Sequence, residues 1–76
     1  MIDLETLRGI LAEELGVSPA DIGAGDDLVN LGLDSLGVIG ISEELRRRGC
    51  GVHYSALVLE PTPEAWLRII GESAAA

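Results

Sequence analysis

Residues 28–49 read LVNLGLDSLGVIGISEELRRRG, and they contain the helix with the clearest start and stop signals in the chain. Asp34 is a suitable N-cap, while three arginines followed by a glycine suit the C-terminal end of a helix. Four side chains fall on one stripe at about 100° per residue and form the predicted core face: Val38, Ile41, Ser42 and Leu45. The pattern therefore predicts a helix from Asp34 to about Arg48, with Leu36 and Ile39 off its core face.

Upstream of this helix, leucines and an isoleucine recur at three- and four-residue intervals after Asp3 and stop at Gly16. This spacing predicts an amphipathic first helix of about twelve residues, capped by Asp3. From residue 17 to residue 33 the periodicity is lost, which predicts a long loop with a single turn starting at Ser18 and Pro19. We expect the loop to be held by its own apolar side chains: Ile22, Leu28, Val29, Leu31 and Leu33.

Two further capping residues predict two more helices downstream. Ser55 is expected to cap a short helical turn over residues 56–59. Thr62 is expected to cap a last helix that has Pro63 at its first position and ends at Gly71.

The length of 76 residues is enough for one domain with one core. Hydrophobic residues make up 47% of the chain, but phenylalanine is absent, so the core should consist of aliphatic side chains anchored by Trp66. The predicted fold is all-α: a small four-helix bundle of three main helices and one short helix, with a long loop between helices 1 and 2. It spans residues 1–76 as a single domain with a frayed tail over residues 72–76.

The chain is strongly acidic, with thirteen acids against five arginines and a formal charge of −8. Residues 1–34 hold eight acids and one arginine, whereas residues 35–76 are nearly balanced. Such a charge disfavours nucleic acid and anionic membranes and favours proteins with basic patches. No apolar run approaches the roughly 18–20 residues that span a bilayer, and Met1 is followed at once by acids rather than by a signal peptide. We expect a free-standing, monomeric, cytoplasmic protein with no membrane or nucleic-acid partner.

Ser35 lies in the segment GLDSLG and has two interpretations. It is either an ordinary residue of a helix start, or its hydroxyl is presented for chemistry. The N-terminus of a helix favours an anion, the apolar Leu36 and Ile39 lie off the core face, and the long loop brings the serine to an edge of the bundle. A serine nucleophile is not supported, because the single histidine, His53, lies in a connector and Gly-x-Ser-x-Gly is absent.

Residues 28–49, followed by VHYSALVLEPTPEAW at 52–66, resemble the phosphopantetheine-dependent carrier proteins. The hallmark of that family is Asp-Ser-Leu after a long first loop, at the start of the second of four helices, and the likeness covers about residues 4–71. It implies that a phosphopantetheinyl transferase uses Mg²⁺ and coenzyme A to attach 4′-phosphopantetheine to Ser35. The carrier itself would then catalyse nothing. It would hold an acyl, aminoacyl or aryl group as a thioester on the terminal thiol of the arm.

The resemblance also implies roles for the neighbours of this serine. Asp34 would cap the helix and assist recognition by the transferase, and Leu36 and Ile39 would be apolar partner contacts. Arg46 and Arg47 form either a partner-selecting patch or a solvated helix end, and both interpretations stay open.

Fatty-acid carriers usually bear acids along the exposed side of this helix, whereas this chain has three arginines at its end. The segment LEPTPEAWLRII at residues 59–70 is similar to peptidyl and aryl carriers of nonribosomal peptide assembly, and Trp66 to aryl carriers in particular. The expected partners are an adenylating or acyltransferase loading enzyme and downstream condensation or tailoring enzymes. A polyketide- or fatty-acid-type acyl carrier is the alternative.

Two alternatives come from other classes of protein. An unmodified helical interaction module would use Leu36 and Ile39 as a simple docking patch. A DNA-binding domain is suggested only by the arginine triplet and is disfavoured by the charge of −8. Cys50 is expected to be a small buried or half-buried side chain after a helix rather than a reactive thiol. No metal site is expected, because Asp21, Asp26 and Asp27 lack the spacing of a calcium loop.

Overall fold

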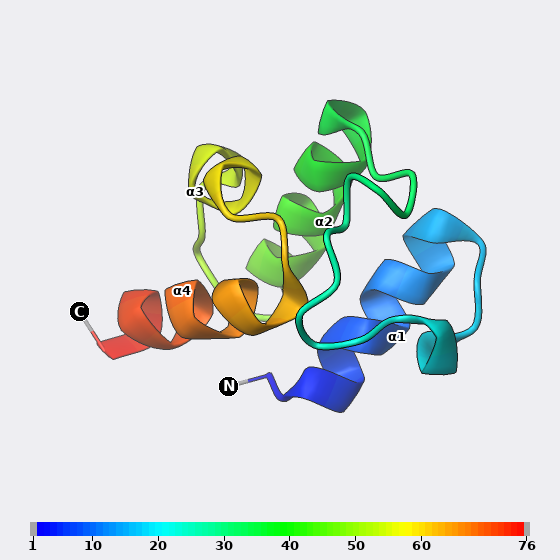
Figure 1. Cartoon of the computed structure of the whole chain (residues 1–76). Helices are drawn as coiled ribbons and strands as arrows, with labels where there is room; N and C mark the ends of the chain where they lie inside the picture. Colours follow the sequence, from blue (N-terminus) through cyan, green and yellow to red (C-terminus); the bar gives the residue numbers. More distant parts are fainter. Residues whose placement is uncertain (1, 76) are drawn as a thin grey trace.

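The computed structural model describes residues 2–75, with the backbone alone for residues 73–75. Within that range the chain forms four α-helices and one 3₁₀ turn and no β-strand: α1 Leu4–Leu15, η1 Pro19–Asp21, α2 Ser35–Arg47, α3 Tyr54–Leu59 and α4 Pro63–Ala75. Helix α1 packs against α2, α4 and η1, and the short α3 packs against α2 and α4 (Figure 1). The predicted four-helix fold, with its long first loop, is confirmed.

Helix α1 has the predicted length of twelve residues and both predicted ends. The Thr6 backbone N–H donates a hydrogen bond of 2.8 Å to Asp3 Oδ1, so Asp3 is its N-cap. Gly16 has a φ of 70° and its N–H donates to the Ala12 carbonyl at 2.8 Å. A residue without a Cβ is favoured in this left-handed conformation, so the glycine ends the helix.

Helix α2 buries the predicted core face, including Ser42, and ends at Arg47, one residue before the predicted end. The Ser42 hydroxyl donates a hydrogen bond of 2.7 Å to the Ile39 carbonyl, which satisfies this polar group inside the core. Asp34 is the N-cap, because its Oδ1 accepts a hydrogen bond of 2.8 Å from the Gly37 N–H. The start of the helix is therefore fixed at the residue predicted from the sequence.

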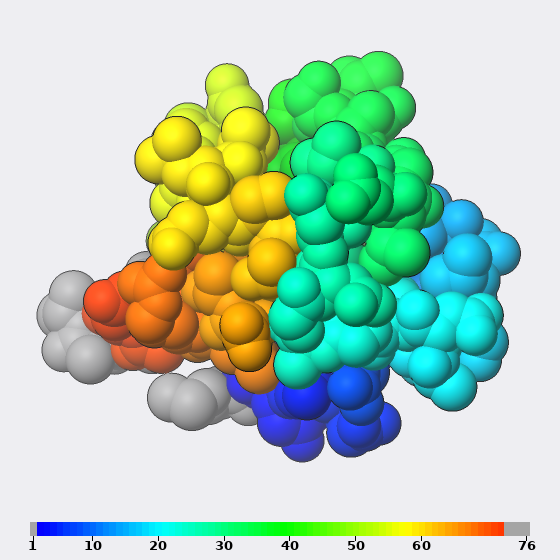
Figure 2. Space-filling model, in the orientation of Figure 1, coloured from blue at the N-terminus to red at the C-terminus, as the bar shows by residue number. Residues whose placement is uncertain are grey.

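The long loop is tied to the corner between α3 and α4 by two backbone hydrogen bonds. The Leu28 N–H donates to the Pro61 carbonyl at 2.8 Å, and the Glu64 N–H donates to the Ala24 carbonyl at 2.9 Å. Figure 2 shows the loop, in teal, running over the front of the molecule beside this corner. Three of the five apolar side chains expected to pin the loop are buried: Ile22, Leu28 and Leu33.

The expectation was wrong for Val29 and Leu31, which are 60% and 37% exposed. Both belong to a tight succession of turns in which the Leu31, Gly32 and Leu33 N–H groups donate to carbonyls three to five residues earlier. Side chains point in different directions around such turns, so only some of them can reach the core.

The structure corrects the start predicted for α3 and the last residue predicted for α4. Helix α3 begins at Tyr54, and its cap is His53 rather than Ser55, because His53 Nδ1 lies 3.2 Å from the Ser55 N–H and accepts its hydrogen bond. Helix α4 continues through Gly71 to Ala75, so residues 72–75 are helical and only residue 76 of the predicted tail lies outside the described range. Alanine is the strongest helix former, which explains why one glycine does not stop this helix.

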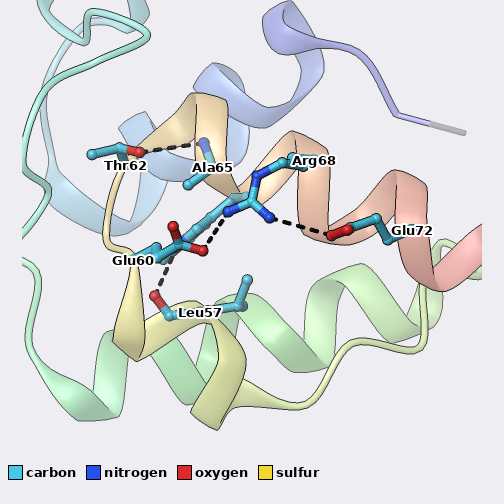
Figure 3. A network of polar contacts seen from close by, with 7 residues as sticks. Leu57, Glu60, Thr62, Ala65, Arg68 and Glu72 are labelled. Carbon is cyan, nitrogen blue, oxygen red and sulfur yellow. Dashed lines mark hydrogen bonds and ion pairs between the residues drawn. The ribbon is translucent and has the colours of Figure 1, made fainter.

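Trp66 was expected to anchor the core, and it is fully buried there; its indole N–H donates a hydrogen bond of 2.9 Å to the Leu57 carbonyl. Figure 3 shows an ion network near Leu57, in which Arg68 bonds to Glu60, at the end of α3, and to Glu72. The hydrogen bond and charge of Glu60 raise the pKa of the Arg68 guanidinium above its usual value. Helix α3 is thus linked to α4 both in the core and at the surface.

None of the helices in the described range is both long enough and apolar enough to cross a lipid bilayer.

Candidate functional site at the start of helix α2

Ser35 is the first residue of α2, and its side chain is exposed to solvent. Within residues 2–75 its hydroxyl has no hydrogen-bond partner, so the oxygen is free to react with a group brought from outside. The only histidine, His53, contacts Ser55 and Tyr54 instead. Ser35 therefore has no general base of its own, and any reaction at its oxygen needs a base from another molecule.

The backbone around Ser35 suits an anion on its oxygen. The first N–H groups of a helix have no intrahelical acceptor and carry the positive end of the helix dipole. Asp34 takes up the N–H of Gly37, while those of Ser35 and Leu36 have no acceptor in the part of the chain that the structure describes. A phosphate ester on the Ser35 oxygen would lie next to these two donors.

An open apolar hollow of about 80 Å³ lies directly beside Ser35. Asp34 and Ser35 contribute to its rim, and the loop, α2 and the α3–α4 corner supply its apolar wall: Val29, Leu33, Val38, Val58 and Pro61. Pockets that enclose a small-molecule ligand usually measure about 300–1,000 Å³. The hollow can support part of a flexible group attached to Ser35, but it cannot enclose a substrate.

Two glycines shape the backbone at this point. Gly32 has a φ of 105°, which only glycine adopts readily, and it turns the loop toward the start of α2. A Cβ on Gly37 would lie 2.8 Å from Leu33 Cδ1 and 3.3 Å from Asp34 Oδ1. The sequence interpretation missed Gly37, whose only signal is a glycine in the first turn of a predicted helix.

The predicted interface residues differ in their exposure to solvent and in their ion pairing. Leu36 is 78% exposed, whereas Ile39 is half-buried. Arg46 is exposed, and Arg47 is bound to Glu44 at 2.7 Å. Asp34, Leu36 and Ile39 lie next to Ser35 or one turn from it, whereas the two arginines lie at the far end of α2.

The remaining candidates for a functional role, Cys50 and the aspartates of the loop, take part in packing or in backbone hydrogen bonds. Cys50 is half-buried and packs against the core. Asp26 and Asp27 accept hydrogen bonds from the N–H groups of Gly23 and Val29, at 2.7 Å and 2.9 Å. Within the described residues, no three side chains of histidine, cysteine or acidic type are placed to hold a metal ion.

The chain is similar in sequence to one family model and to several known proteins. The family model described as "Phosphopantetheine attachment site" matches residues 5–70. Phenyloxazoline synthase MbtB of Mycobacterium sp. (strain MCS) is 35% identical over 71 residues, which are 93% of this chain and 6% of that protein. No solved structure matches the chain.

Two other relatives, which are named as different proteins, have a similar sequence identity to this chain. Isochorismatase of Bacillus subtilis (strain 168) is 36% identical over 87% of this chain, and pyochelin synthetase PchE of Pseudomonas aeruginosa (strain UCBPP-PA14) is 38% identical over 79%. The chain spans only 21% and 4% of these two proteins. The similarity thus concerns one small domain of much longer proteins.

Proposed function

Because this chain belongs to the phosphopantetheine attachment-site family, we propose that Ser35 is the attachment residue and that the domain is a carrier in nonribosomal peptide-type biosynthesis. The observation that carries the proposal is the exposed, unpaired hydroxyl of Ser35 at the first position of α2. When bound, the phosphopantetheine arm supplies a terminal thiol that holds an acyl group as a thioester.

The residues around Ser35 position it but do not catalyse. Asp34 fixes the start of α2 through its bond to Gly37, and this places the Ser35 hydroxyl at the outer edge of the bundle. The N–H groups of Ser35 and Leu36 favour the negative charge of the phosphate ester. A phosphopantetheinyl transferase supplies the base and Mg²⁺, and coenzyme A is the donor. The domain is therefore a substrate of that enzyme and has no catalytic activity itself.

We assign the cargo to the aryl or aminoacyl class rather than to the fatty-acid or polyketide class. Two relatives are named as a phenyloxazoline synthase and a pyochelin synthetase, and Trp66 with the preceding Pro-Thr-Pro segment is similar to aryl and peptidyl carriers. The partners would be an adenylating enzyme that loads the thiol and condensation or tailoring enzymes that use the loaded group. All of these reactions would take place in the cytoplasm, where coenzyme A is available.

The attachment is tested by incubating the protein with coenzyme A, Mg²⁺ and a broad-range transferase, followed by intact-mass spectrometry. The wild type should gain the mass of one phosphopantetheine, and Ser35→Ala should gain none. Ser55→Ala is the matched control, because Ser55 is also exposed and also lies in the first turn of a helix. An unmodified wild type, or a modified Ser35→Ala variant, would refute the assignment of Ser35.

The cargo class is tested on the modified protein. Aryl- and aminoacyl-adenylating enzymes are compared with a malonyl-transferring acyltransferase, and the acyl group on the protein is read from its mass. Loading by an adenylating enzyme supports the proposal, whereas loading by the acyltransferase alone would move the domain to the polyketide class.

A further inference from the structure

A groove of about 270 Å³ lies between α1 and α2, which pack against each other (Figure 1). Its floor is apolar, because Ile10 and Ile41 line it and both are buried in the core. Its sides are acidic, because Glu13 and Glu14 of α1 and Glu44 of α2 line it as well. Pockets for small-molecule ligands usually measure about 300–1,000 Å³, so the groove has the size for one long side chain rather than for a cofactor.

Two glycines of α2 bring the carboxylate of Glu14 against that helix. The Cγ of Glu14 lies 3.5 Å from the position of a Cβ on Gly37, and its Oε1 lies 3.5 Å from the position of a Cβ on Gly40. The Glu14 side chain therefore lies in space that larger residues would fill. Its carboxylate borders the groove instead of extending away from both helices.

Two of the three carboxylates in the groove have no cation. Glu44 binds Arg47 at 2.7 Å and Arg48 at 3.0 Å, whereas Glu13 and Glu14 form no ion pair within residues 2–75. Arg47 also lines the groove, so a guanidinium already lies among its acids on the α2 side. The α1 side has acids of the same kind and leaves room for a second cation.

The groove lies on the far side of α2 from the attachment serine. At about 100° per residue, Gly40 is about 140° and Glu44 about 180° around the helix from Ser35. The hollow beside Ser35 is bounded by other residues, among them Val38 and Val58. A molecule in the groove therefore leaves Ser35 and its hollow uncovered.

We propose that the α1–α2 groove is a second docking site, which binds a basic segment of a partner protein by taking up one of its arginine side chains. The guanidinium would lie between Glu13 and Glu14, and the methylene stem would cover the apolar floor at Ile10 and Ile41. Such a partner could hold the carrier while the group on Ser35 is used by another protein. The link would then raise the effective concentration of the carrier near its enzymes.

The charge of this part of the chain favours a basic occupant. Residues 1–34 hold eight acids and one arginine, and that arginine, Arg8, is bound to Glu5. Such a field attracts cationic segments and repels acidic ones. Arginine fits better than lysine, because its planar group has five donors and can bind two carboxylates at once.

The test titrates a short amidated peptide of alternating arginine and alanine into the ¹⁵N-labelled protein and follows the backbone amide signals by NMR. The signals of Glu13, Glu14, Gly40 and Ile41 should shift together and saturate with one dissociation constant. A peptide with citrulline in place of arginine has nearly the same shape without the charge, and it should bind at least tenfold more weakly.

Glu14→Gln should weaken binding of the arginine peptide about fivefold or more. Glu64→Gln is the matched control, because Glu64 is also exposed and free of ion pairs and loses the same charge, but it lies on α4 outside the groove. It should change the dissociation constant less than about twofold. Equal losses in the two variants would overturn the inference, since binding would then follow the net charge alone, and so would a titration that does not saturate.

A second pair of variants tests the competing internal cation. Arg47→Gln removes the guanidinium that lines the groove and should tighten binding at least twofold more than Arg46→Gln, which removes the same charge from an exposed residue outside the groove. Equal effects of the two would contradict the assignment. Circular dichroism verifies that all four variants are folded.

This inference goes beyond the proposed function and does not depend on it. Ser35→Ala should bind the arginine peptide as the wild type does, because the serine lies on the other side of α2. A groove that fails to bind the peptide would leave the attachment of phosphopantetheine untouched, and a protein that takes up no phosphopantetheine would leave the groove untouched.

Discussion

The indole N–H of Trp66 donates a hydrogen bond to the carbonyl of Leu57 and so joins α4 to α3 inside the core. Leu57 is also the one buried side chain of α3 among its six residues. The position of this short helix therefore depends on a few contacts: the Leu57 side chain, the bond from Trp66 and the ion pair between Glu60 and Arg68. Because Val58 and Pro61 form part of the hollow beside Ser35, these contacts also set the shape of the site.

We predict that Trp66→Phe lowers the free energy of unfolding by about 2–4 kcal/mol. The change removes volume from the core and leaves the Leu57 carbonyl without its donor, and both effects destabilise. Chemical denaturation followed by circular dichroism measures the loss. Tyr54→Phe is the control, because Tyr54 is 41% exposed and should change stability by less than about 0.5 kcal/mol. Equal stability of the two variants would show that the Trp66–Leu57 bond contributes nothing.

Gly37→Ala and Gly40→Ala should change stability in opposite directions. Alanine in a helix interior is favoured over glycine by about 0.8–1 kcal/mol, and this gain applies at Gly40, where a new Cβ would meet only Glu14 Oε1 at 3.5 Å. At Gly37 the Cβ would approach the buried Leu33 to 2.8 Å and crowd Asp34. Overpacking of this kind costs about 1–3 kcal/mol and should outweigh the gain. The denaturation midpoints of the two variants, compared with that of the wild type, test both directions. If both variants were more stable than the wild type, Leu33 would have to move aside at little cost.

Asp34→Ala should lower the free energy of unfolding by about 0.5–2 kcal/mol, because the Gly37 N–H loses its side-chain acceptor. Asp34→Asn keeps an acceptor oxygen and should lose only the interaction of the charge with the helix dipole, about 0.3–1 kcal/mol. Thermal unfolding of both variants at neutral pH measures the difference. If alanine and asparagine destabilised equally, the hydrogen bond would not be the source of the effect.

The hydrogen bond from the Thr6 backbone N–H lowers the pKa of Asp3 below its usual value of 3.8. A lowered pKa means that the folded state favours the ionised carboxylate, so the stabilisation is present above pH 3.8 and is lost as the pH falls below 3.8 through the pKa of the folded protein. Asp3→Asn keeps a capping oxygen but does not titrate. The stability difference between wild type and Asp3→Asn, measured by thermal unfolding, should therefore shrink on acidification below pH 3.8. A difference independent of pH would contradict this assignment.

The sequence by itself determined the helices and the place of the serine. Asp3 and Asp34 are strong caps, Gly16 is a strong stop, and the apolar spacing of α2 defines its buried face, so these features depend on neighbours a few residues apart along the chain. The exposure of Ser35 and Leu36 follows from the same periodicity. Local chemistry was sufficient because each of these signals acts within one or two helical turns.

Only the tertiary structure decided features that depend on residues distant in the sequence. The bond of Leu28 to Pro61 and the pairing of Arg68 with Glu60 arise when segments fold against each other. A one-dimensional pattern does not contain these distances, since the packing of the helices creates them.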